Sequence, residues 1–109
     1  MGRNFTNEMI DAVAGRFRVL SEPIRIRILQ GLRDGERTVS ELTRDLEMSQ
    51  PNASKHLRIL QDAGLVARDQ RGNSVYYSIA DESIFELCEV VCDSLGARFR
   101  EKAEIFEAV

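Results

Sequence analysis

Hydrophobic side chains recur at helical spacing near the start of the chain. The positions are Phe5, Met9, Val13, Phe17 and Leu20, which lie four, four, four and three residues apart. This spacing places all five on one face of a helix. We therefore predict a helix over about residues 5–20 whose apolar face needs something to pack against.

The next segment carries two conflicting patterns. Residues 24–28 alternate isoleucine with arginine, which is typical of a strand. Pro23, however, fits the first turn of a helix, where a missing N–H costs no hydrogen bond, and an apolar helical stripe continues to Leu32. We favour a helix that is capped by Ser21 and ends near Gly35.

Two short capped helices are predicted next. Thr38 and Glu41 have the spacing of a capping box, in which each side chain accepts a hydrogen bond from the other residue's backbone N–H. Ser49 offers a second N-cap before Pro51, and Gly64 suits the left-handed position that ends a helix. The apolar positions expected to be buried are Val39, Leu42, Leu46, Ala53, Leu57 and Leu60. The pair predicts a helix-turn-helix over about residues 38–63.

The pattern then changes to a hairpin. Residues 65–68 and 75–79 are strand-like, and the polar, glycine-containing segment 69–74 joins them. We expect a β-hairpin, or wing, over about residues 65–79.

A long final helix is predicted over about residues 81–107, with Asp81 as its N-cap. Its apolar stripe comprises Ile84, Leu87, Cys88, Val91, Leu95, Phe99 and Phe106. Four short elements cannot cover that much apolar surface, so we expect this helix and the helix over 5–20 to pack against a second copy of the chain. The predicted fold is mainly α with a small β-hairpin: a single winged helix-turn-helix domain, residues 1–109, that dimerises through its N- and C-terminal helices.

Composition narrows the class of protein. The chain has 109 residues, 43% of them hydrophobic and 30% charged, which fits one folded domain. It has no apolar run long enough for a membrane span and no signal-peptide pattern, so we expect no membrane contact. Two cysteines do not make a disulfide framework, and a reducing, cytoplasmic location is the expectation.

Polar and cationic residues gather on the second helix of the predicted helix-turn-helix and on the wing. Such side chains can read base edges in the major groove or contact phosphates. The candidate DNA-binding residues are Ser49, Gln50, Asn52, Ser54, Lys55 and Arg58 on the helix, and Arg68, Arg71 and Asn73 on the wing. The net charge of −3 does not exclude DNA, because a polyanion responds to the local face and not to the total.

Several blocks resemble the ArsR/SmtB family of winged-helix repressors. They are Leu20-Ser-Glu-Pro-Ile-Arg-Ile-Arg-Ile-Leu-Gln-Gly-Leu32, Val39-Ser-Glu-Leu42, Ser49-Gln-Pro-Asn-Ala-Ser-Lys-His-Leu-Arg-Ile-Leu-Gln-Asp-Ala-Gly-Leu-Val66 and Gly72-Asn-Ser-Val-Tyr-Tyr77, at family spacing over about residues 9–100. The resemblance implies a homodimeric cytoplasmic repressor of double-stranded DNA. It also implies a palindromic operator near the protein's own promoter and release by an inducer.

The chain departs from the family's common metal sites. Residues 40–46 contain no cysteine and the last helix contains no histidine. The single histidine, His56, is expected to be structural. Cys88 and Cys92, one helical turn apart, are the remaining sensing candidates.

Three interpretations of this cysteine pair stay open. The thiols are buried core residues, ligands of a soft ion such as arsenite, antimonite or copper(I), or sensors of oxidants or persulfides. A protein-interaction module without DNA binding is the alternative to a repressor. An enzyme is not expected, because the thiols lack a Cys-x-x-Cys arrangement and a histidine or aspartate partner.

Overall fold

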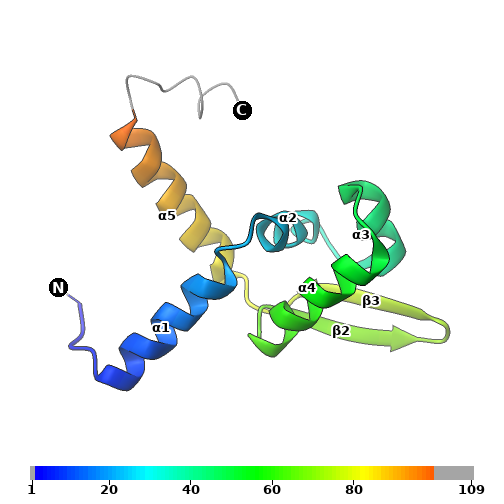
Figure 1. The fold of residues 1–109 in the computed structure, drawn as a ribbon, viewed down its shortest axis with the longest axis horizontal. Coiled ribbons are helices and arrows are strands. Elements are labelled where there is room, and N and C mark those ends of the chain that lie inside the picture. The colour runs from blue at the N-terminus through cyan, green and yellow to red at the C-terminus, as the bar shows by residue number, and fades with distance from the viewer. Residues whose placement is uncertain (1, 100–109) are drawn as a thin grey trace.

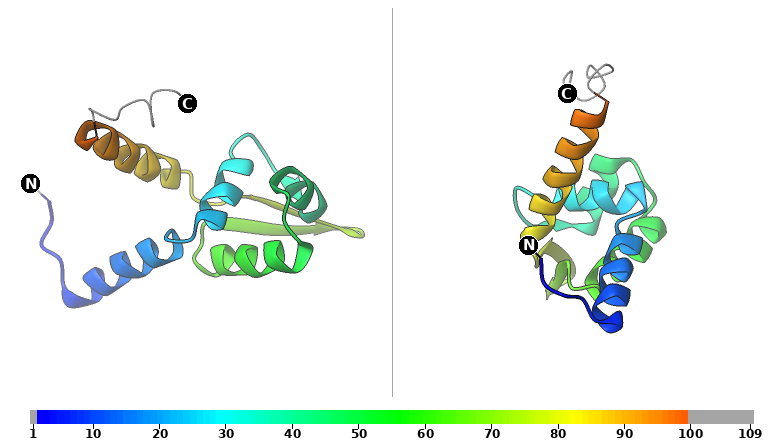
Figure 2. Two further views of the ribbon diagram at one scale, coloured as in Figure 1. Left: turned by 45° about the horizontal axis from the view of Figure 1, so that its top comes forward. Right: turned by 90° about the vertical axis from the view of Figure 1, so that its left-hand side faces the viewer.

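The computed structural model describes residues 2–99, which form five helices and three strands (Figure 1). Their order is α1 (Asn7–Val19), α2 (Pro23–Gly31), β1 (Arg37–Thr38), α3 (Val39–Leu46), α4 (Gln50–Asp62), β2 (Val66–Arg71), β3 (Ser74–Ile79) and α5 (Ser83–Arg98). The middle elements pack together, whereas α1 and α5 extend away from them on the side opposite the hairpin tip (Figures 1 and 2). The predicted fold class, a mainly helical winged helix-turn-helix, is confirmed.

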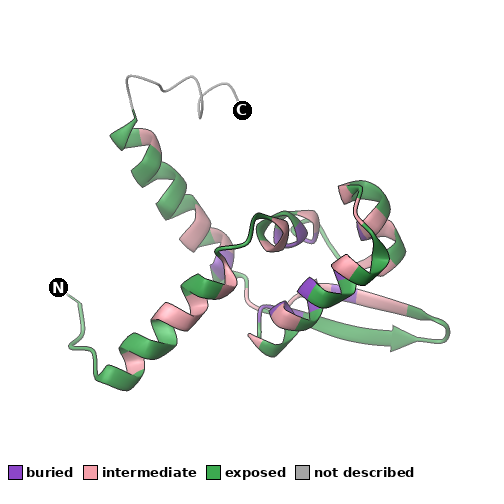
Figure 3. Ribbon diagram, in the orientation of Figure 1, coloured by how far each residue is buried: buried purple, intermediate pink, exposed green. Residues whose placement is uncertain are grey.

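The two arms, α1 and α5, make the chain wider than a compact domain. Its radius of gyration is 16.0 Å, against roughly 13 Å for a compact domain of this length. No residue of α1 is buried, and Ile84 at the start of α5 is the only buried residue of that helix. Figure 3 shows both arms mainly in the exposed class. Among residues 2–99, nothing therefore covers their apolar faces.

The predicted caps of the helix-turn-helix are present. Thr38 Oγ1 accepts from the N–H of Glu41 at 3.1 Å, and Glu41 Oε1 accepts from the N–H of Thr38 at 2.8 Å. Ser49 Oγ accepts from the N–H of Asn52 at 3.3 Å. Gly64, which follows α4, has φ +78°, a conformation that side chains with a Cβ rarely adopt.

Residues 24–28 are helical, as the stripe and the proline predicted. Burial explains this outcome, because Ile28, Leu29 and Leu32 occupy the core and only a helix brings these three positions to one side. The predicted cap was wrong. Glu22 is the N-cap residue and makes no side-chain capping bond, while the hydroxyl of Ser21 donates to the carbonyl of Arg18 at 2.6 Å.

The sheet has one more strand than predicted. β2 and β3 form the expected antiparallel hairpin, and the two-residue β1 pairs with the outer side of β3. A two-residue strand leaves no alternating pattern in the sequence, so it could not be recognised from the residues alone. It ties the start of α3 to the wing.

The core lies where α2, α3 and α4 meet the base of the sheet. Its buried apolar residues are Ile28, Leu29, Leu32, Leu42, Ala53, Leu57, Leu60, Leu65, Val66, Tyr77 and Ile84. Four of the six positions predicted to be buried in the helix-turn-helix are among them, while Val39 and Leu46 are half-buried at its edge.

Only part of the predicted last helix falls within the described residues. α5 ends at Arg98, and Phe99 leaves the helical conformation at φ −102°, ψ 35°. Asp81 lies one residue before the N-cap, Glu82, but its Oδ1 does accept from the N–H of Ser83 at 3.0 Å. Residues 100–107 of the predicted helix lie outside the described residues.

Candidate nucleic-acid interface

The outer face of α4 carries most of the predicted DNA-binding residues. Its inner face is fixed by four buried side chains, Ala53, His56, Leu57 and Leu60. Helical periodicity therefore turns Lys55 and Arg58 outward, and both are exposed. Among residues 2–99, Lys55 has no ion-pair partner, whereas Arg58 Nε lies 3.7 Å from Asp62 Oδ2, one turn further along. Within the part of the chain that the structure describes, Lys55 is thus the cation of α4 that is free to meet a phosphate or a base edge.

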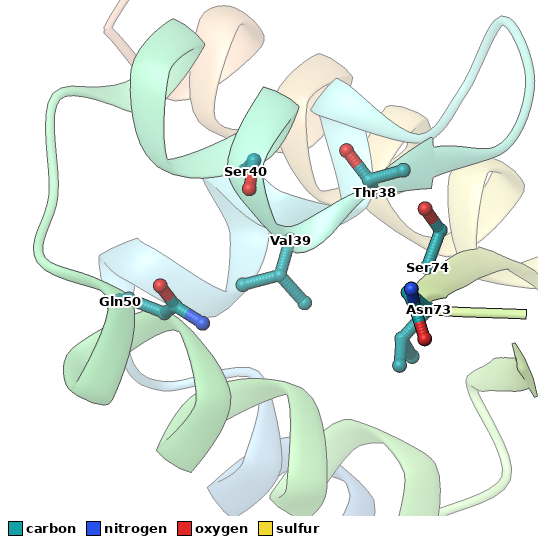
Figure 4. A pocket seen from close by; sticks show the side chains of 7 residues that line it. Thr38, Val39, Ser40, Gln50, Asn73 and Ser74 are labelled. Atoms are coloured by element: carbon teal, nitrogen blue, oxygen red, sulfur yellow. The ribbon is translucent and has the colours of Figure 1, made fainter.

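The first turn of α4 faces the wing across a polar groove of about 360 Å³ (Figure 4). Gln50 lies on one side of this groove and Asn73 on the other, with Val39 between them. Thr38 and Ser40, at the start of α3, complete its upper edge. The structure therefore brings a predicted helix residue and a predicted wing residue to the same groove.

A second depression, of about 520 Å³, lies further along α4. Ser54 and Arg58 of the helix line it together with Arg68 of β2 and the buried Tyr77 of β3. Asn52 is different, because it is half-buried and lines a separate pocket beside the connection between α3 and α4. Ser49 is exposed, but its hydroxyl already serves as the helix cap.

The two wing arginines lie on opposite faces of the sheet. Side chains alternate along a strand, so residues three apart point in opposite directions. Arg68 stands opposite Tyr77 in the register and shares the face that packs toward α4. Arg71 stands opposite Ser74 and lies on the other face, together with Asp69. The two arginines were predicted together by their charge, but this alternation separates them.

Arg71 is held by three neighbours. Its Nη1 and Nη2 donate to the two carboxylate oxygens of Glu36, each at 2.7 Å, and its Nε donates to Asp69 Oδ2 at 2.8 Å. The guanidinium also lies over the ring of Tyr76, 4.4 Å from its centroid. These hydrogen bonds lower the pKa of the Glu36 carboxyl and raise the pKa of Arg71. Glu36 was not among the predicted site residues, and its sequence position, 35 residues before Arg71, gives no local signal.

His56 has the structural role expected of it. It is 7% exposed, and its Nδ1 accepts from Arg25 Nε at 3.1 Å. Arg25 also donates to the carbonyl of Val19 at 3.0 Å, which links α1, α2 and α4. Burial, and then the nearby positive charges of Arg25 and Lys55, lower the pKa of the imidazole.

Cys88 and Cys92 line one apolar groove between α1 and α5. This groove has a volume of about 320 Å³, and its other lining residues are Phe17, Leu20, Ile26, Leu87, Val91 and Leu95. Cys88 is half-buried, and burial, together with the charge of Glu89, raises the pKa of its thiol. Cys92 is exposed. Among residues 2–99, no group of three or more histidine, cysteine or acidic side chains is placed to hold a metal ion.

The apolar surface of the arms extends beyond this groove. The exposed large hydrophobic residues of the described chain are Phe5, Ile10, Val13, Phe17, Ile26, Val90, Val91, Leu95 and Phe99. All except Phe5, which precedes α1, Ile26 of α2 and Phe99, which follows α5, belong to the two arm helices. None of the helices between residues 2 and 99 has the length and apolar content that a bilayer crossing requires.

Comparisons with known proteins agree with this geometry. The sequence profile described as "Bacterial regulatory protein, arsR family" matches residues 22–68. The HTH-type transcriptional repressor SmtB of Mycobacterium tuberculosis is 39% identical over 82% of this chain, which spans 64% of the length of that relative. The arsenical resistance operon repressor of Bacillus subtilis is 31% identical over 90% of this chain and 91% of its own length.

A solved structure has the same fold. It is the homodimeric winged helix-turn-helix DNA-binding domain Mb0332 from Mycobacterium bovis, with 32% identity and a TM-score of 0.73. The likeness covers 89% of this chain and 95% of that domain. That relative is homodimeric, and this chain, whose helices α1 and α5 expose apolar faces, has the same fold.

Proposed function

The chain belongs to the ArsR family of bacterial regulatory proteins, and from this we propose that it is a homodimeric repressor of a palindromic operator in double-stranded DNA. The observation that carries the proposal is the arrangement of α4 and the wing. Lys55, which is exposed and has no ion-pair partner among residues 2–99, lies on the outer face of α4, and Gln50 faces Asn73 across the polar groove. The relatives named as repressors support the same role.

A dimer fits the requirements of such an operator. Two copies related by a twofold axis present two α4 helices, which suits two half-sites about one helical turn of DNA apart. The apolar faces of α1 and α5 are not covered by any other part of residues 2–99, and burying them against a second copy supplies the association energy. Gln50 is suited to adenine, while Lys55 can contact guanine or phosphate.

A salt titration of DNA binding tests this proposal. The probe is a fluorescent duplex of about 30 base pairs from the region upstream of the protein's own gene, long enough for two half-sites. We expect log K to fall linearly with log salt concentration. Lys55→Gln should flatten the slope by about 1.8, because it removes one phosphate contact, worth about 0.9, from each of the two subunits. Arg18→Gln, on α1, is the matched control and should leave the slope unchanged. Absence of any salt-dependent binding would favour a protein-interaction module instead.

We further propose that the release signal acts at Cys88 and Cys92. The two thiols line the groove between α1 and α5, so a ligand or an oxidation product there would change the shape of the proposed dimer surface. One relative is named for resistance to arsenic, an element that soft thiolate ligands bind. One described subunit gathers fewer than three such ligands, so a metal or metalloid site with more donors needs thiolates from both copies.

The raised pKa of Cys88 favours Cys92 as the first thiol to react with an oxidant. A buried thiol stays protonated and is a poor nucleophile, whereas Cys92 is exposed to solvent. A soft ion behaves differently, because it can displace the thiol proton as it binds. The two chemistries are therefore separable by experiment.

The test compares the wild type with the double variant Cys88→Ser/Cys92→Ser, which has no thiol because the chain has only these two cysteines. Anaerobically purified protein bound to the duplex is titrated with arsenite in one series and with diamide in another. We expect one reagent to release the wild type and neither to release the double variant. If an inducer acts equally on both proteins in cells, the cysteines are core residues without a sensing role.

A further inference from the structure

The structure assigns different roles to the two wing arginines: we propose that Arg71 clamps the wing to the segment before β1 through Glu36, and that Arg68 is the wing cation that meets DNA. The role of Arg71 concerns the folded chain itself, whereas the role of Arg68 rests on the proposed function. Arg71 is thus a positioning residue, although its place at a hairpin tip is typical of a phosphate contact.

The clamp sits where the wing has little other support. Every residue of β2 except Val66 is exposed, so the outer half of the hairpin has few core contacts. Arg71 pairs with Ser74 at the last register position before the turn, where Gly72 has φ +59°. The bidentate bonds to Glu36 join this end of the hairpin to a segment outside it.

The clamp also helps to position the residues that line the polar groove at the start of α4. Glu36 directly precedes β1, which pairs with β3 and leads into α3. Asn73 lies between Arg71 and β3, and it lines the groove opposite Gln50. Holding Arg71 therefore fixes the distance across which Asn73 and Gln50 face each other, which a DNA-binding surface needs before its ligand arrives.

Charge argues against Arg71 as a phosphate contact. Two carboxylates, those of Glu36 and Asp69, surround one guanidinium, which leaves a net negative charge on this face of the wing. Arg71 would have to leave both carboxylates and the ring of Tyr76 before it could pair with a phosphate. Arg68, on the other face, has no ion-pair partner among residues 2–99 and lines the same depression as Arg58.

The first experiment needs no DNA. Amide hydrogen exchange across residues 66–79 is measured by nuclear magnetic resonance for the wild type, Glu36→Gln, Arg71→Gln and the double variant. We expect each single substitution to speed exchange near the turn by up to about fivefold, the effect of a favourable exposed ion pair. The double variant should exchange no faster than the faster single variant. Unchanged or multiplying rates would overturn the clamp.

The second experiment assigns the DNA contact. Salt titrations with the same duplex compare Arg71→Gln with Arg68→Gln, a matched substitution on the same strand. We expect Arg68→Gln to flatten the slope by about 1.8, one phosphate contact from each subunit, and Arg71→Gln to lower affinity several-fold at every salt concentration without changing the slope. A flattened slope for Arg71→Gln with an unchanged slope for Arg68→Gln would overturn the assignment.

The two experiments fail in different ways. If the wild type shows no salt-dependent binding, the proposed repressor function is wrong and the assignment of Arg68 to DNA is overturned with it. Hydrogen exchange still decides whether Glu36 and Arg71 clamp the wing, because that measurement depends only on the folded chain.

Discussion

Phe17 offers a direct test of the proposed dimer surface. Its side chain lines the groove between α1 and α5, yet it is 50% exposed in one subunit. A phenylalanine has about 200 Å² to bury, so about 100 Å² remains available to a partner. At about 25 cal/mol per Å², and allowing for the methyl group that alanine retains, Phe17→Ala costs about 2 kcal/mol per subunit.

The twofold symmetry doubles this effect. Each copy of a symmetric dimer contributes the same patch, so the substitution acts twice and costs about 4 kcal/mol in association. That free energy corresponds to a nearly thousandfold rise in the dimer dissociation constant. The helix itself should persist in far-ultraviolet circular dichroism, because alanine is the better helix former.

Sedimentation equilibrium measures the dissociation constant. Arg18→Ala is the control, because Arg18 is the next residue of α1, is exposed and does not line the groove. We expect this control to change the constant by less than about threefold, as is usual for a surface substitution. A wild type that is monomeric at micromolar concentration, or equal constants for the two variants, would refute the reasoning.

Three further predictions concern the stability of the folded chain. Thr38→Ala removes one half of the capping box of α3 and should lower the free energy of unfolding by about 1 kcal/mol in urea titrations; no change would mean that the cap is dispensable. Leu57→Ala opens a cavity at a fully buried position and should cost about 2–5 kcal/mol in the same assay, against less than about 0.5 kcal/mol for the exposed Ser54→Ala. His56 has a lowered pKa in the folded state, so the unfolded chain takes up a proton first as the pH falls. Stability should therefore decline from about pH 6.5, the unfolded value, down to the lowered folded pKa, and the same pH series on His56→Gln should be flat over this range.

Local patterns predicted most of the helical structure. The capping box at Thr38, the cap at Ser49 and the glycine after α4 were readable because each depends on residues a few positions apart. The secondary structure of residues 24–28 was harder to predict, because the alternation of isoleucine with arginine favoured a strand, and only the apolar stripe and Pro23 favoured a helix. The core contacts of Ile28 and Leu29 show why the stripe prevailed.

The sequence identified candidate residues for the interface, but it did not give their arrangement in space. The exposed face of α4 follows from helical periodicity, so Lys55 and Arg58 were found from the sequence. Asn52 was included with them, but the connection between α3 and α4 half-buries it. Arg68 and Arg71 were grouped by charge, although alternation along a strand already separates them.

The sequence by itself determined the helices, the hairpin, the caps of the helix-turn-helix and the family, because these depend on residue type and on spacing within a few turns. Only the tertiary structure revealed that Glu36 reaches Arg71, that β1 adds to the wing, and that Cys88 and Cys92 share a groove with α1. Each of these contacts joins residues distant along the chain. Their partners are fixed by how the elements pack, which a local pattern of hydrophobic and polar positions does not record.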